Sequence, residues 1–71
     1  MSMEEMLIEL RPINKRHTRL IKQYGKLWKV ERGPKSMFCF DGRDGVMAHP
    51  VDNPNKKSNF LFEYIDVLET A

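Results

Sequence analysis

The spacing of apolar and polar positions changes character near residue 12. The apolar residues of the first segment fall at helical spacing, i, i+3, i+4 and i+7: Met3, Met6, Leu7 and Leu10. Ser2 and Glu5 have the spacing of a capping box. Pro12 disfavours helical geometry in the residue before it. The pattern therefore predicts a short amphipathic α-helix over residues 1–11.

From residue 16 onward the pattern favours strands. β-branched and aromatic side chains are frequent, and Trp28 and Val30 alternate with charged residues. The expected strands cover residues 16–24, 26–32, 37–40, 46–49 and 60–69. Clusters of glycine, proline and small polar residues separate them and predict turns at residues 33–36 and 41–45 and an exposed loop at 52–59.

A helical interpretation of the segment before Trp28 remains open. Residues 14–30 could form a basic amphipathic helix, because Leu20, Tyr24 and Leu27 lie at helical spacing. Gly25 inside such a helix costs about 1 kcal/mol, which favours strands. A compromise, with a helix up to Tyr24 and a strand from residue 26, also fits the sequence.

These elements predict a mainly β fold, a five-stranded SH3-like small barrel with a short N-terminal α-helix. The tail FEYIDVLE, Phe62 to Glu69, resembles the end of an SH3-like domain, where a turn with a tyrosine and an aliphatic residue precedes the closing strand. A length of 71 residues allows a single domain over 1–71, with the helix at 1–11 and the barrel at 16–69.

Composition limits the cellular locations that we expect for the protein. No apolar run approaches the roughly 20 residues that span a membrane, and the acidic start of the chain is unlike a secretory signal. A single cysteine excludes an internal disulfide, so we expect a reducing, cytoplasmic location. A core this small is barely sufficient to stabilise a folded monomer, so we also expect a surface that binds a partner, or a homodimer.

The net charge of +2 conceals a strong asymmetry. Residues 11–35 hold nine basic side chains and one acidic side chain, Glu31, whereas both flanking segments are net negative. The candidate basic face consists of Arg11, Lys15, Arg16, Arg19, Lys22, Lys26, Lys29 and Arg32. Such a block of positive charge is suited to binding an acidic protein surface or, alternatively, nucleic acid.

Two further sets of residues are candidates for contact. Tyr24 and Trp28 could stack on unpaired bases if exposed, although the only tryptophan of a small domain is expected in the core. The stripe with Met3, Met6 and Leu7 could contact a protein partner, or could instead pack on the domain itself.

Side chains for catalysis or metal binding are scarce. His17, Cys39 and His49 lack the number and spacing of a zinc site. Cys39, placed between two phenylalanines in an expected buried strand, is expected to be an inert thiol. We therefore expect no metal, no cofactor and no enzymatic activity. The expected function is a small non-catalytic binding module, or an accessory or inhibitory factor, that contacts an acidic protein surface through its basic segment, with a nucleic-acid-binding SH3/OB-like domain as the alternative.

Overall fold

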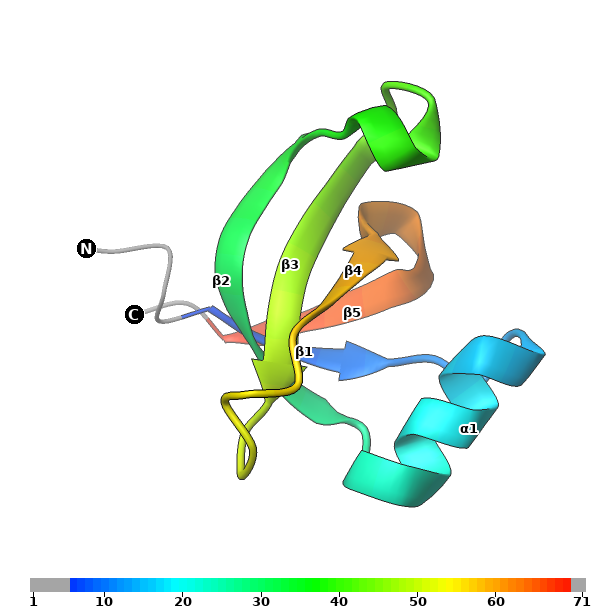
Figure 1. Ribbon diagram of the computed structural model, residues 1–71, viewed down its shortest axis with the longest axis vertical. Helices are drawn as coiled ribbons and strands as arrows, with labels where there is room; N and C mark the ends of the chain where they lie inside the picture. Colours follow the sequence, from blue (N-terminus) through cyan, green and yellow to red (C-terminus); the bar gives the residue numbers. More distant parts are fainter. Residues whose placement is uncertain (1–5, 70–71) are drawn as a thin grey trace.

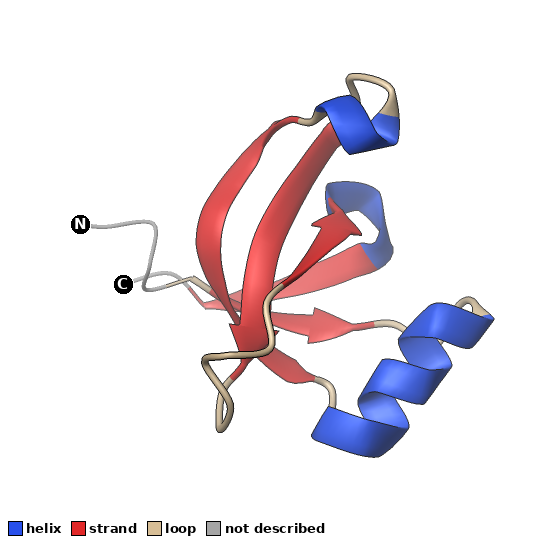
Figure 2. Ribbon diagram, in the orientation of Figure 1, coloured by secondary structure: helices blue, strands red, loops and turns tan. Residues whose placement is uncertain are grey.

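The computed structural model describes residues 6–69, which form a five-stranded antiparallel sheet and one α-helix (Figures 1 and 2). The strands are β1 (Leu7–Leu10), β2 (Leu27–Ser36), β3 (Asp44–Pro50), β4 (Ser58–Leu61) and β5 (Ile65–Glu69). The helix α1 (Lys15–Tyr24) follows β1, and two 3-10 turns, η2 (Phe38–Phe40) and η3 (Phe62–Tyr64), precede β3 and β5. The mainly β fold and the number of strands are confirmed.

The strands lie in the order β4-β3-β2-β1-β5, and every neighbouring pair is antiparallel. Strand β1 lies between β2 and β5, with Ile8 opposite Trp28 of β2 and Val67 of β5. Strands β2 and β3 form a long hairpin that extends beyond the rest of the sheet and carries η2 at its tip (Figure 1). The end strands β4 and β5 do not pair in the described residues, so the sheet is not closed into a barrel.

The core is built by alternation along the strands. Every second side chain points inward, as a pleated strand requires. The main cluster of buried apolar side chains consists of Met6, Ile8, Leu10, Trp28, Val30, Val46, Ala48, Phe60 and Ile65. The indole Nε1 of Trp28 donates a hydrogen bond to the carbonyl of Gly25 at 3.0 Å, so the ring is buried without an unsatisfied donor.

The N-terminal region corrects the first prediction. Residues 7–10 form β1 and not part of a helix, while residues 1–5 of the expected helix lie outside the described part of the chain. The segment MLIEL fits both a strand and a helix. Met6, Ile8 and Leu10 alternate as in a strand, whereas Met6, Leu7 and Leu10 have helical spacing. Pairing with β2 and β5, which come from later in the chain, decides for the strand.

Four further local predictions need correction. The single strand expected at 60–69 is wrong, because β4 ends at Leu61, η3 follows it, and β5 begins at Ile65 at the other end of the sheet. Residues 15–24 are helical, so the strand expected at 16–24 is wrong and the compromise with a helix up to Tyr24 is confirmed. Residues 38–40 form a 3-10 turn in place of a buried strand. The turn expected at 33–36 lies within β2, where the register with β3 shifts between Val30 and Lys35. By contrast, the strand expected at 46–49 is present within β3.

Candidate functional site

Helix α1 begins and ends at residues that suit those positions. Asn14 has extended backbone geometry, and its side-chain Oδ1 accepts a hydrogen bond from the backbone N–H of His17 at 2.7 Å. Gly25 ends the helix with a φ of 86°, and its N–H donates to the carbonyl of Ile21 at 2.7 Å. Gly25 therefore terminates the helix, which excludes a helix that continues to Val30 and agrees with the alternative that ends at Tyr24.

The inner face of α1 attaches the helix to the sheet. His17 is 2% exposed, and its ring lies edge-on to Phe60 with the centroids 5.3 Å apart. Its Nδ1 lies 2.9 Å from the carbonyl oxygen of Arg11 and donates to it, because a carbonyl can only accept. Burial lowers the pKa of His17, and the nearby Arg16 charge lowers it further, so the neutral ring is favoured.

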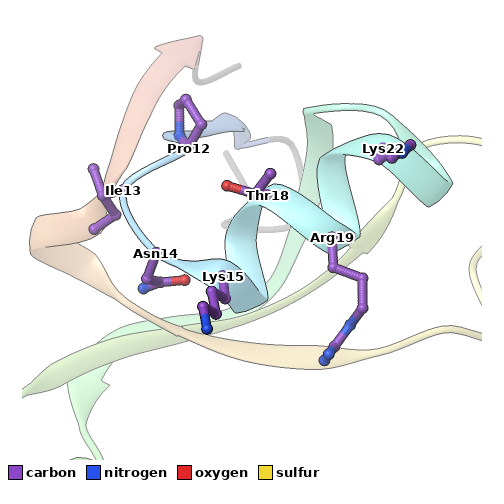
Figure 3. Close-up of a pocket in the computed structure, with 7 residues that line it drawn as sticks. All are labelled: Pro12, Ile13, Asn14, Lys15, Thr18, Arg19 and Lys22. Atoms are coloured by element: carbon purple, nitrogen blue, oxygen red, sulfur yellow. The ribbon is translucent and has the colours of Figure 1, made fainter.

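The outer face of α1 is basic and borders a shallow hollow of about 500 Å³ (Figure 3). Helical spacing places four side chains on this face, and all of them line the hollow: Lys15, Thr18, Arg19 and Lys22. Pro12, Ile13 and Asn14, from the segment before the helix, line the rest of it. We call this set the α1 surface. It combines three cations with a small apolar floor.

Arg16 connects α1 to the sheet. Its Nη2 donates to the main-chain oxygen of Asn59 in β4 at 3.0 Å, and its Cζ lies 4.9 Å from the centroid of the Phe60 ring. Partial burial and the neighbouring Arg19 charge lower the pKa of Arg16. The side chain still carries its charge, because the ordinary pKa of arginine is very high. Arg16 therefore has a structural contact and a charge available at the edge of β4.

A second hollow, of about 450 Å³, lies beneath the tip of the β2–β3 hairpin. Across three strands Arg32 is opposite Met47 and Met47 is opposite Asn59, so these residues form one row on the sheet. The side chains that give the hollow its character are Arg32, Lys35, Phe38, Cys39, Met47 and Asn59. We call this set the hairpin surface. Its most unusual member is Phe38, which is 100% exposed.

A third cluster lies further along the sheet, and its charges neutralise one another. His49 Nδ1 donates to Glu31 Oε2 at 2.6 Å, and Lys57 Nζ lies 3.4 Å from Glu31 Oε1. Desolvation alone would raise the pKa of Glu31, but the hydrogen bond from His49 and the Lys57 charge lower it overall. This cluster is therefore less suited to binding an anion than the α1 and hairpin surfaces.

Ion pairs divide the predicted basic face into two groups. Arg11 pairs with Asp66 at 3.1 Å and Lys26 lies 3.9 Å from Glu9, so these two charges are partly compensated. Among the described side chains, which are those of residues 6–68, the other predicted members take part in no ion pair: Lys15, Arg16, Arg19, Lys22, Lys29 and Arg32. Most of them border the α1 surface or the hairpin surface.

The residues predicted to stack on bases or to contact a protein are mostly buried or half-buried. Trp28 is fully buried, so it offers no face to a ligand, and Tyr24 is half-buried with its ring packed edge-on against Trp28. Met6 is in the core and Leu7 is half-buried on β1, so these two residues form no exposed helical stripe. Met3 lies outside the described residues.

Phe38 and Asn59 are not among the residues predicted to form a site. Phe38 lies in the run Met37 to Phe40, whose apolar composition predicts a buried strand. The available signal was the dense cluster of turn-forming residues on both sides of that run, from Gly33 to Ser36 and from Asp41 to Gly45. A short apolar run between two turn clusters at a hairpin tip cannot bury all of its side chains.

Some further properties hold for the described residues. No helix in residues 6–69 is long and apolar enough to cross a membrane. The side chains that the structure describes contain no group of three or more histidine, cysteine or acidic residues placed to hold a metal ion. In the comparisons with known proteins, no family model and no curated protein matches the sequence, and no solved structure gives a significant match.

Proposed function

We propose that this protein is a non-catalytic module that binds nucleic acid through the unpaired cations of α1 and β2. The observation that supports this proposal is the distribution of ion pairs. Four acidic side chains each pair with a cation, and none of these cations belongs to the α1 or hairpin surface: Glu9, Glu31, Glu63 and Asp66. Among the side chains that the structure describes, those of residues 6–68, the cations of those two surfaces have no such partner.

The arrangement of the two surfaces favours a long polyanion over a compact acidic patch. Arg16 of α1 contacts Asn59, and Asn59 also lines the hairpin surface together with Arg32 and Lys35. Cations thus lie on both sides of Asn59. A compact acidic protein surface would need only one of the two groups, whereas a phosphate backbone can pass along both.

The chemistry of the α1 surface suits phosphate contacts. Lys15 and Lys22 are seven residues apart on one helix face, which separates them by about 10 Å along the helix axis. Arg19 lies between them, and the Thr18 hydroxyl can donate a further hydrogen bond. Side chains of these types make most phosphate contacts in nucleic-acid complexes. Each neutralised phosphate releases counterions, so binding should weaken steeply with salt.

We also propose an SH3-like classification for the sheet. The order β4-β3-β2-β1-β5 and the turn η3 immediately before β5 support it. In this arrangement α1 occupies the long connection between β1 and β2, and η2 occupies the connection between β2 and β3. Binding surfaces on such connections are common, because loops can vary while the sheet holds them in place.

The experiment is a titration of labelled single-stranded DNA, duplex DNA and RNA with the purified protein, followed by fluorescence anisotropy at several salt concentrations. We expect the double variant R19Q/K22Q to bind more weakly than the wild type. Its slope of log K against log salt should be smaller by about 1.4 to 1.8, the value for two lost phosphate contacts.

The matched control is K56Q/K57Q, which removes two charges from the loop before β4 and leaves both surfaces intact. Equal losses in the two double variants would overturn the proposal, since only net charge would then matter. Absence of binding at about 50 mM salt would also overturn it. In that case, selection of acidic sequences from a random peptide library, lost in R19Q/K22Q, would establish an acidic protein partner in place of nucleic acid.

A further inference from the structure

We propose that Phe38 is a stacking platform for one unpaired base, so that the nucleic acid bound by this protein is single-stranded. This inference rests on the proposed function and assigns a strand type to it. Its first support is the position of the ring. Phe38 is 100% exposed, whereas Met37 is 9% exposed and Phe40 is half-buried. Of these three side chains, only that of Phe38 is fully accessible to a ligand.

Hydrogen bonds hold the backbone of the turn that carries this ring. The N–H of Met37 donates to the carbonyl of Arg43 at 3.1 Å, and the N–H of Gly42 donates to the carbonyl of Met37 at 2.9 Å. The hydroxyl of Ser36 donates to the carbonyl of Gly42 at 2.7 Å. These bonds close the tip of the hairpin around Phe38. A ligand that stacks on the ring therefore does not need to order the loop first.

The tight packing beneath the turn explains why Phe38 points outward. Gly45 leaves room for the Phe40 ring, since a Cβ at Gly45 would lie 2.6 Å from two of its carbons and 2.9 Å from the Met37 sulfur. Phe40 and Met37 therefore fill the space over β3. With that space filled, the turn places Phe38 on the opposite side, in solvent.

The surroundings of Phe38 suit a nucleotide. Arg32 and Lys35 line the hairpin surface and can neutralise a phosphate, while the Asn59 amide lines it and can both donate to and accept from a base edge. No acidic side chain is among the described residues that line this hollow. An aromatic face next to cations is the arrangement that binds single strands without strict sequence preference.

The hairpin surface is also continuous with the cations of α1. Asn59 Nδ2 lies 4.0 Å from Cys39 Sγ in η2, and the Asn59 main-chain oxygen accepts from Arg16. A strand stacked on Phe38 would therefore have Arg32 and Lys35 beside it, with Arg16 on the far side of Asn59. Duplex DNA keeps its bases stacked inside the helix, so it cannot use the Phe38 ring without unpairing.

The test measures binding of labelled oligothymidine, oligouridine and a DNA duplex of equal length by the wild type, F38A, F38L and F38Y. We expect F38A and F38L to bind the single strands about 5-fold to 100-fold more weakly, the range for one lost base–aromatic stack. F38Y should bind like the wild type, and duplex affinity should be equal in all four proteins. Because Phe38 is fully exposed, all four should unfold at the same temperature.

The leucine variant separates stacking from a simple apolar contact. Full binding by F38L would overturn the inference, because an aliphatic side chain cannot stack. An equal loss of duplex and single-strand binding in F38A would also overturn it. Either result leaves the proposed function in place, provided that the wild type still binds with a steep salt dependence. If the wild type binds no nucleic acid at all, the proposed function fails first and this inference fails with it.

Discussion

Arg16 and Asn59, 43 positions apart in sequence, are joined by a hydrogen bond of 3.0 Å from the guanidinium Nη2 to the main-chain oxygen. Asn59 belongs to β4, which forms one edge of the sheet. Exposed edge carbonyls are sites where another strand can pair, and a charged side chain that occupies one blocks such pairing. The same contact fixes α1 beside the edge strand. It thereby determines the relative position of the α1 and hairpin surfaces.

We predict that R16A lowers the free energy of unfolding by about 1 to 2 kcal/mol, because it removes a charged hydrogen bond and a contact over the Phe60 ring. R16K keeps the charge but lacks the planar fork of donors, so it should recover only part of this loss. Urea denaturation followed by circular dichroism measures both variants. Equal stability of R16A and the wild type would show that the contact contributes nothing to holding α1.

We predict that stability falls as the pH drops below about 6.5, the pKa of histidine in an unfolded chain. Burial lowers the pKa of His17 in the folded protein, so the unfolded state binds a proton more readily. The contribution is constant above pH 6.5 and is lost progressively as the pH falls toward the folded-state pKa, with a slope of at most about 1.4 kcal/mol per pH unit.

Urea denaturation at several pH values measures this slope. H17F removes the titrating group, so its unfolding free energy should depend less on pH, although it also loses the hydrogen bond to the Arg11 carbonyl. H49Q serves as the control, because it changes the other described histidine and leaves the slope from His17 intact. A slope that survives in H17F and disappears in H49Q would assign the pH dependence to the Glu31–His49 pair.

We predict that N14A destabilises the protein by about 1 kcal/mol. Asn14 Oδ1 accepts from the His17 N–H at 2.7 Å, and alanine leaves that donor at the start of α1 without a partner. N14S should retain most of the stability, since serine is also a good N-cap residue. Thermal unfolding followed by circular dichroism compares the three proteins. Similar losses in N14A and N14S would argue against a capping role.

We predict that G45A destabilises the protein by about 1 to 3 kcal/mol, the usual cost of overpacking. The added Cβ would overlap the Phe40 ring and approach the Met37 sulfur, so η2 must move. Combining G45A with F40L should recover part of the stability, because the smaller side chain relieves the overlap. Urea denaturation of the two single variants and the double variant measures this coupling. Additive effects would place the strain elsewhere.

Local sequence signals predicted some parts of the fold well. Trp28 and Val30 alternate with charged residues, and both are buried in β2 as that alternation predicts. A strand at Val46 was also recognised from its apolar run and flanking turns. The predictions at these positions are correct because the two-residue period of a strand is enough to predict which side chains are buried. It does not require knowledge of which strands are neighbours.

The candidate site was harder to predict, because distant contacts decide which side chains are free. The sequence shows that residues 11–35 are basic, but only the folded chain brings Asp66 to Arg11 and leaves Arg19 unpaired. Phe38 looks like a core residue by composition, and its exposure follows from the packing of Phe40 against Gly45. Exposure and pairing are properties of tertiary neighbours, which no local window contains.

The sequence by itself determined the single cysteine, the basic segment, the breaks at Pro12 and Gly25, and the alternation that forms the core face of β2. Tertiary structure alone decided that residues 7–10 are a strand and that residues 15–24 are a helix. Both segments are locally compatible with either element, and propensity differences of about 1 kcal/mol or less per residue cannot separate them. Strand pairing of β1 on both sides, together with burial of His17 against Phe60, supplies the remaining free energy.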